Sequence, residues 1–243
     1  MMDRAFIDLH CHTSASFDSL ADPVKVARAA ASRGLTHLIV TDHDRIDGAM
    51  RARDAAPDGL TVIVGEEVKT ADGDLICAFL ERPIPPGLSA ADTIAAAREQ
   101  GGLVGIPHPF DRFRGSLSKS AQLAAIAPLV DWVEVHNARL VGGGNEEAAA
   151  FAQEHHRPGV AVSDAHSVLE IGVAYTVLEG DPSTASGLLA ALEGLTGLAG
   201  SGRTELVAGR ASYTIRLWTP IAKAVQRLRG NGRVGPGMPG MPE

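Results

Sequence analysis

Short apolar runs alternate with amphipathic segments of helix length over most of this chain. The first run is followed by a helix predicted over Pro23–Ser32, with Asp22 as its N-cap and Gly34 just past its end. The same alternation continues to residue 192. We predict strands over residues 5–9, 37–41, 60–67, 75–80, 103–106, 132–135, 159–162 and 174–178, and helices over residues 23–32, 48–56, 90–100, 119–127, 145–155 and 184–192. Strands separated by helix-length segments indicate a parallel β/α architecture rather than a sandwich.

Five polar segments follow predicted strands and hold six of the nine histidines. They are Asp8-Leu9-His10-Cys11-His12, Thr41-Asp42-His43-Asp44, Ile106-Pro107-His108-Pro109, Glu134-Val135-His136-Asn137 and Ser163-Asp164-Ala165-His166. Side chains at the carboxyl ends of barrel strands converge on one mouth. An open doubly wound sheet would instead bind its ligand at one switch point. The pattern therefore favours an α/β fold of the closed barrel type, with the active site at the C-terminal ends of the strands.

These segments combine imidazole and carboxylate groups without thiolates, which is a ligand set for divalent metal ions. Residues i and i+2 of a strand share a face, so His10 and His12 point the same way as Asp8, and Cys11 points into the packed layer. Asp164 and His166 repeat this spacing. Two prolines stiffen the backbone around His108 and fix its direction. Considered without the other motifs, His43 is either a metal ligand or a residue that caps the loop after its strand.

Two further pairs depend on the same alternation. Only one of Glu66 and Glu67 can face the mouth, and we expect the other to be solvated or to orient a ligand. Glu134 and His136 should share a face, either as a site with His136 as a ligand or as a buried polar pair. The remaining histidines, at positions 37, 155 and 156, are expected at the surface.

Composition narrows the possible partners. A chain of 243 residues with 45% hydrophobic residues is long enough for one catalytic domain. Its net charge of -7 argues against binding long nucleic acid, although a small phosphorylated ligand remains possible. Two cysteines make no disulfide framework, and no apolar run is long enough to cross a bilayer, so we expect a cytoplasmic protein without stable membrane insertion. Neither Gly101-Gly102 nor Gly142-Gly143-Gly144 forms a dinucleotide-binding or phosphate-binding loop.

The chain divides into three predicted segments. Residues 1–200 form the catalytic barrel with a small C-terminal extension, residues 201–229 form a basic amphipathic segment, and residues 230–243 form a disordered tail rich in glycine and proline. Trp218, Ile221, Val225 and Leu228 recur at helical spacing in the basic segment. We expect this stripe to pack on the barrel flank or on a second subunit, because short isolated helices are marginal in water. The alternative is an acidic membrane surface.

The order of the motifs resembles the polymerase and histidinol phosphatase (PHP) superfamily. The matching features span residues 5–180: HxH at His10 and His12, a downstream Asp18, TDHD at residues 41–44, GxE ending at Glu67, His108-Pro109, and SDAH at residues 163–166 followed by Glu170-Ile171-Gly172. Several motifs in the correct order are far more specific than any one of them. The resemblance implies a distorted (β/α)7 barrel and a stand-alone phosphoesterase with a trinuclear metal centre.

The resemblance also implies a ligand set. One ion would be held by His10, His12, Glu67 and Asp164; Glu67 would bridge to a second ion held by His108 and His136; and a third would lie between Asp18, His43 and His166. Two to three divalent ions follow from this, and Mn, Fe and Zn all suit such ligands.

The expected reaction is hydrolysis of a phosphate ester by a hydroxide shared by the two ions at Glu67. The expected catalytic residues are Glu67, His108, Asp164, Arg139 and Arg45. Arg139 and Arg45 are the first candidates for binding the phosphate, and Arg112 and Arg114 are the second. The substrate would be a small phosphorylated metabolite, a nucleotide or a short oligonucleotide. Two alternatives are a metal-dependent amide or ester hydrolase and a non-catalytic metal-binding module.

Overall fold

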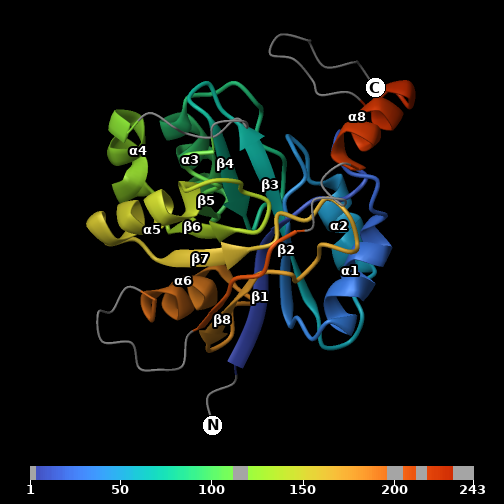
Figure 1. Cartoon of the computed structure of the whole chain (residues 1–243), viewed down its shortest axis with the longest axis horizontal. Coiled ribbons are helices and arrows are strands. Elements are labelled where there is room, and N and C mark those ends of the chain that lie inside the picture. Colours follow the sequence, from blue (N-terminus) through green and yellow to red (C-terminus); the bar gives the residue numbers. More distant parts are fainter. Residues whose placement is uncertain (1–3, 112–119, 196–204, 212–217, 232–243) are drawn as a thin grey trace.

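The computed structural model describes residues 4–111, 120–195, 205–211 and 218–231. Its sheet contains the strands β1 (Arg4–Cys11), β2 (His37–Val40), β3 (Thr61–Lys69), β4 (Asp74–Ala78), β5 (Leu103–Ile106), β6 (Trp132–Asn137), β7 (Gly159–Val162), β8 (Tyr175–Glu179) and β9 (Glu205–Val207). The described helices are α1 (Pro23–Ser32), α2 (Asp47–Asp54), α3 (Ala90–Glu99), α4 (Ser120–Ile126), α5 (Gly144–Glu154), α6 (Ala185–Glu193) and α8 (Trp218–Leu228), with a 3₁₀ turn at Ala127–Leu129. Helices lie around the outside of the curled sheet (Figure 1).

The sheet closes into a distorted barrel, as predicted. The strand order is β7-β6-β5-β4-β3-β2-β1-β8-β9. Two backbone hydrogen bonds join the end of β1 to the segment after β7, from His12 N to Ala165 O at 2.8 Å and from Asp164 N to His10 O at 2.9 Å. The first and seventh strands therefore meet, and the carboxyl ends of the parallel strands surround a common mouth.

Strand β4 departs from the expected parallel arrangement. It runs antiparallel to both β3 and β5. A tight turn closed by Thr70 N and Gly73 O joins β3 to β4, and no crossover helix separates them. Antiparallel neighbours need only such a turn, whereas parallel neighbours need a crossover of a dozen or more residues.

Every strand and helix predicted before residue 192 is present. Helix α1 begins as expected, because the Asp22 carboxylate accepts hydrogen bonds from Val24 N and Lys25 N. One element was missed: β9 pairs antiparallel with β8. Its three residues carry too short a pattern to predict a strand, and they place a strand within the segment 201–229 that was expected to be basic and amphipathic.

The strands bury two apolar layers on their opposite faces. Leu38 and Val40 pack in the layer that contains the helix residues Val26 and Ala27, whereas Ile39 lies in the other layer. Trp132 is fully buried in that second layer. A Cβ at Gly105 would lie 2.1 Å from the Trp132 indole, so glycine is required beside it.

Two expectations about surface positions are wrong. His37 is buried, with Nε2 3.0 Å from Ser183 Oγ. Trp218, Ile221 and Leu228 in α8 are 59%, 48% and 90% exposed, so these residues of the stripe do not pack on the barrel flank, and packing on a second subunit stays a prediction. The face of α8 that is buried instead contains Ala222 and Gln226.

Some expectations lie outside the described residues. They concern residues 196–204, 212–217 and 232–243, which hold the end of the expected C-terminal extension, parts of the basic segment and most of the expected disordered tail. Among the helices that the structure describes, none is both long and apolar enough to span a bilayer.

Candidate metal centre

The barrel mouth gathers eight of the nine side chains predicted as metal ligands. They come from the ends of β1, β2, β3, β5 and β7 and from the loop that follows β1: His10, His12, Asp18, His43, Glu67, His108, Asp164 and His166. Six of these are buried to 4% exposure or less, and His43 and His166 are only slightly more open. So many buried ionisable groups require partners of opposite charge.

The first cluster contains His10, His12, Glu67 and Asp164. Nε2 of His10 and Nε2 of His12 lie 3.0 Å apart. Glu67 Oε2 lies 3.4 and 3.3 Å from these two nitrogens, and Asp164 Oδ1 lies 3.6 and 3.5 Å from them. Two ligand atoms bound about 2.1 Å from one ion are separated by roughly 3.0–3.4 Å for angles between 90° and 109°. The spacing of His10, His12 and Glu67 therefore fits three ligands around a single divalent ion, and Asp164 lies beside them.

Glu67 connects this cluster to two more histidines. Its Oε1 lies 3.1 Å from His108 Nε2, and its Oε2 lies 3.2 Å from His43 Nδ1. Burial alone would raise the pKa of Glu67, but the nearby imidazoles of His43 and His10 hold that pKa well below its usual range. Glu67 is therefore an anion with both oxygens directed at imidazole nitrogens.

Glu66 lies on the opposite face of β3 and is neither solvated nor directed at a ligand. Its side chain is fully buried, and Oε2 accepts a hydrogen bond from Ile84 N at 2.8 Å. Burial raises the pKa of Glu66 to about 8, so this carboxyl carries a proton at neutral pH. The expectation of a solvated or ligand-orienting Glu66 is wrong, because the outer face of β3 is covered by the chain around Ile84.

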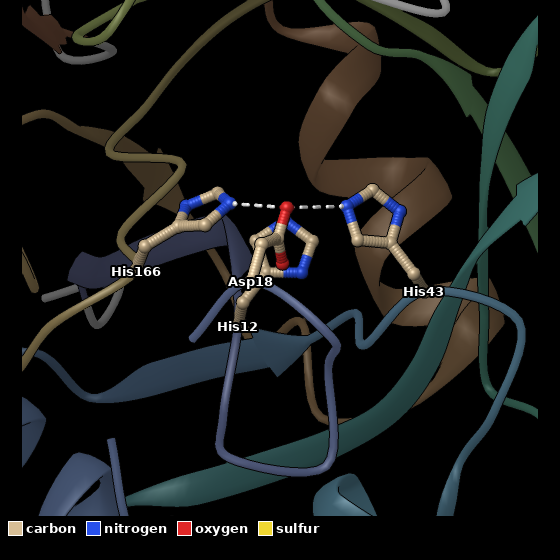
Figure 2. Close-up of side chains that lie close together, drawn as sticks. All are labelled: His12, Asp18, His43 and His166. Atoms are coloured by element: carbon tan, nitrogen blue, oxygen red, sulfur yellow. Dashed lines mark ion pairs between the residues drawn. The ribbon is translucent and has the colours of Figure 1, made fainter. Parts of the chain in front are cut away.

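The second cluster contains His12, Asp18, His43 and His166 (Figure 2). Asp18 lies between two imidazoles, with Oδ2 3.3 Å from both His43 Nε2 and His166 Nε2. Burial opposes the charged form, yet His166 and His43 hold the pKa of Asp18 well below its usual range. Within the described part of the chain, Asp18 Oδ1 is buried without a hydrogen-bond partner. An anionic oxygen buried in this way fits a cation ligand.

Glu134 supports the ligands from behind. Its Oε1 lies 2.6 Å from His10 Nδ1, and its Oε2 accepts a hydrogen bond from His108 N at 2.8 Å. A carboxylate behind a metal-binding imidazole fixes the orientation of the ring and raises its basicity. Glu134 was recognised in the sequence, but it was paired with His136, so its role in orienting His10 and His108 was not predicted.

His136 does not join either cluster. A register shift between Glu134 and His136 breaks the alternation of β6 against β7. His136 Nε2 consequently lies 2.8 Å from Gly209 O. Asn137 reaches the site instead, where its amide donates to Glu134 Oε2 at 3.0 Å and to Asp164 Oδ2 at 3.1 Å. The assumption of strict alternation was wrong here, and so was the expected pairing of Glu134 with His136.

The two arginines expected to grip phosphate are both engaged with acidic partners. Arg45 contacts Asp47 and donates to Asn231 Oδ1 at 2.8 Å. Arg139 pairs with the buried carboxylate of Glu170 and donates to Thr219 Oγ1 at 2.6 Å. Burial first, and then the charge of Arg139, lower the pKa of His166, so Arg139 lies at the edge of the second cluster. Arg112 and Arg114 lie outside the described residues.

Two of the candidate ligands have strained backbones. His108 and Asp164 have positive φ angles of 28° and 51°. Such conformations cost about 1–3 kcal/mol in residues other than glycine and persist where the surrounding structure enforces them. Prolines flank His108, and the bond from Asp164 N to His10 O closes the barrel, so the local sequence and the fold both enforce these directions.

Comparisons with known proteins agree with this geometry. A family model described as PHP domain matches residues 8–142, and one described as PHP-associated matches residues 142–196. The uncharacterized protein MJ0417 of Methanocaldococcus jannaschii is 32% identical over 173 residues, which cover 70% of this chain and 68% of that protein.

Two solved structures share the fold. A two-domain protein from Bacteroides vulgatus, described as containing a PHP-like metal-dependent phosphoesterase, has a TM-score of 0.70 at 19% identity over 86% of this chain and 66% of that chain. Endonuclease Q in complex with a 27-mer duplex has a TM-score of 0.58 at 18% identity over 79% of this chain and 57% of that chain. The family models cover more than half of the sequence and the motifs meet at one barrel mouth, so this chain belongs to the PHP family.

Proposed function

We propose that this protein is a metal-dependent phosphoesterase that hydrolyses a small phosphorylated metabolite or a nucleotide. The observation that carries the proposal is the set of eight imidazole and carboxylate side chains at the barrel mouth, six of which, His10, His12, Asp18, His43, Glu67 and His166, have ligand atoms with the spacing of metal ligands. The phosphoesterase description of the Bacteroides vulgatus protein supports the reaction class. The alternative of a metal-dependent amide or ester hydrolase has a structural neighbour of its own, an amidohydrolase from Chromobacterium violaceum with a TM-score of 0.57 at 16% identity, so it stays the second candidate.

The proposed ligands follow the two clusters. His10, His12, Glu67 and Asp164 would hold one ion, and His12, Asp18, His43 and His166 would hold another. Glu67 Oε1 and His108 Nε2 offer two ligands for a further ion. We therefore propose two to three divalent ions, with Mn, Fe or Zn suited to these ligands. When bound, such ions lower the pKa of coordinated water toward ~7 and draw the phosphoryl oxygens into place.

The residues of the chain have distinct proposed roles around these ions. Glu67, Asp18 and Asp164 supply the anionic charge that holds the cations, and the imidazoles complete the set. Glu134 orients His10 and, through its backbone, His108. Arg139 would bring positive charge to the side of the second cluster while Glu170 positions its guanidinium. Arg45 would reach phosphate only after leaving Asp47 and Asn231.

We propose separately that the phosphate ester has a small leaving group. The pocket beside the ions, described below, is of a size suited to a small leaving group. The expectation that long nucleic acid is excluded gains no support from the comparisons, because one solved neighbour is an endonuclease bound to a 27-mer duplex. A cytoplasmic location likewise stays a proposal.

The test is a combined metal and activity assay on the purified full chain. Elemental analysis should find two to three divalent ions per chain, and a panel of phosphorylated metabolites and short oligonucleotides with Mn, Fe or Zn should reveal hydrolysis that a chelator abolishes. The matched variants are His10→Ala, which should lose metal and activity, and Glu154→Gln, which changes an exposed acid of α5 and should lose neither. Activity that persists in His10→Ala with a chelator present would contradict the proposal.

A further inference from the structure

A pocket opens directly beside the second cluster. It has a volume of about 280 Å³, and Asp18 and His166 form its inner edge. Helix α8 provides another wall, with Trp218, Thr219 and Ala222. A substrate whose phosphate lies at the ions would therefore extend its leaving group into this pocket.

Helix α8 is fixed over the loop that carries Asp18. Gln226 is buried, and its side-chain amide donates to the backbone carbonyls of Ser14, Ser16 and Ser19 at 2.8, 3.1 and 2.7 Å. Asn231 Nδ2 donates to Ala15 O at 3.0 Å. These bonds give backbone carbonyls of the loop hydrogen-bond donors from α8 and from the residue Asn231 that follows it. The hydrogen bonds of Gln226 and Asn231 therefore fix the position of α8, which forms one wall of the pocket, relative to the loop that carries Asp18.

A second connection joins α8 to the opposite side of the pocket. Arg139 donates to Thr219 Oγ1 and also pairs with Glu170, whose Oε2 accepts a hydrogen bond from His166 N at 3.1 Å. The first turn of α8 is therefore tied to the segment that presents His166. Helix α8 also lies beyond both matched family segments, which end at residue 196.

The pocket combines apolar and polar side chains. Leu20, Ala21, Val168, Trp218 and Ala222 form its apolar surface, and Asp22, Lys25, Ser167 and Thr219 also line it. Trp218 is 59% exposed and lines the pocket, so its indole is accessible to a ligand and is not buried in the core. An indole favours planar aromatic partners through stacking. The volume lies near the lower end of small-molecule sites, which suits a single ring system.

We propose that this pocket binds the leaving group of the substrate and that Trp218 makes it selective for a planar aromatic group. The inference rests on the proposed phosphoesterase function and adds the substrate class. Trp218 is thereby a specificity-determining residue outside the metal centre. The remaining walls limit the size of the aromatic group, and the ions and their ligands act on the phosphate.

The test compares phosphate monoesters of three primary alcohols of similar acidity: benzyl, cyclohexylmethyl and ethyl phosphate. Replacing the indole in Trp218→Ala should lower kcat/KM for benzyl phosphate about tenfold, mainly through a higher KM, because stacking contributes to binding before the reaction. The same variant should change kcat/KM for ethyl phosphate by less than about twofold. Trp218→Phe keeps an aromatic face and should retain most of the benzyl activity. Ile221→Ala, an exposed apolar position on the same helix that does not line the pocket, is the control.

A binding measurement separates this inference from the proposed function. Calorimetry with benzylphosphonate and ethylphosphonate, which resist hydrolysis, should show tighter binding of the benzyl compound by the original protein and no such preference in Trp218→Ala. Equal loss for the benzyl and cyclohexylmethyl esters would overturn aromatic selectivity, and equal effects on benzyl and ethyl esters would overturn the pocket assignment. Selective binding without turnover of any ester would refute the phosphoesterase proposal while leaving the pocket intact.

Discussion

The two adjacent glutamates of β3 show how one position along a strand changes the chemistry of a carboxyl group. Glu67 is surrounded by imidazoles, which favour its charged form. Glu66 is buried and accepts one backbone hydrogen bond, from Ile84 N, and burial raises its pKa to about 8. The same residue type is thus an anionic ligand candidate on one face and a neutral hydrogen-bond acceptor on the other.

The pair gives the first prediction. Glu67→Gln removes the negative charge shared by the two clusters, and we expect it to reduce turnover by at least about a hundredfold and to lower the metal content. Glu66→Gln replaces a neutral acid with a neutral amide of similar shape and should retain most of both. Steady-state rates and elemental analysis of the two variants provide the comparison. Loss of metal in Glu66→Gln with normal content in Glu67→Gln would mean that the assignment of faces is reversed.

His136 and its neighbour Asn137 give the second prediction. His136→Ala removes the contact with Gly209 O and should lower thermal stability while metal content stays normal. Asn137→Ala removes the donor shared by Glu134 and Asp164 and should weaken metal affinity instead. Metal titrations and thermal melts of both variants distinguish the roles. Weaker metal binding in His136→Ala, rescued by excess metal, would restore His136 as a ligand.

At the scale of elements, α8 connects the C-terminal region to the metal centre. Figure 1 shows it away from the sheet, on the side of α1 and α2. Its apolar stripe is largely exposed, and a single buried glutamine makes the central contacts. Packing of this stripe on a second copy of the chain remains a prediction, and so does the oligomeric state.

The third prediction concerns Gln226. Gln226→Ala removes the amide that donates to the carbonyls of Ser16 and Ser19 and leaves Ser14 O only the longer contact with Asn231, so we expect the free energy of unfolding to fall by about 1–3 kcal/mol. The variant should also bind metal more weakly, because the freed loop carries Asp18. Arg227→Ala, an exposed neighbour, is the matched control. Chemical denaturation and metal titration measure both effects, and a variant as stable as the control would show that α8 does not hold the loop.

At the scale of the whole molecule, the candidate metal centre lies where the barrel closes, between β1 and the segment after β7. His10, His12 and Asp164 belong to the segments whose backbone hydrogen bonds close β1 against the chain after β7. Candidate ligands from β1 and from the segment after β7, which are far apart in the sequence, therefore share the first cluster. Binding an ion there should stabilise closure itself, because an ion that binds only the folded state shifts the unfolding equilibrium.

Metal removal gives the fourth prediction. Dialysis against a chelator should lower the midpoint of thermal unfolding, and adding the divalent ion back should restore it. His10→Ala and Asp164→Ala should have a reduced metal content and a smaller shift on adding metal. Calorimetric melts at matched protein concentration measure these changes. An unfolding midpoint that does not respond to a chelator in a protein shown to contain metal would contradict the coupling of binding to closure.

The sequence by itself determined the order of strands and helices, the barrel class, the PHP family, and the positions of eight side chains that meet at the mouth. It could do so because strand periodicity is local, and because the ends of parallel strands meet on one edge whatever the details of packing. The motif at His10 and His12 shows this, since its shared face follows from spacing alone.

Only the tertiary structure decided what depends on contacts between distant segments. The register shift in β6 turned His136 toward Gly209 and brought Asn137 to Asp164, although the local pattern indicated the reverse. The antiparallel β4 and the docking of α8 through Gln226 likewise depend on partners far along the chain. Hydrophobic spacing says which face of an element is apolar, but the free energy of packing and of satisfying buried polar groups decides which face is covered and by what.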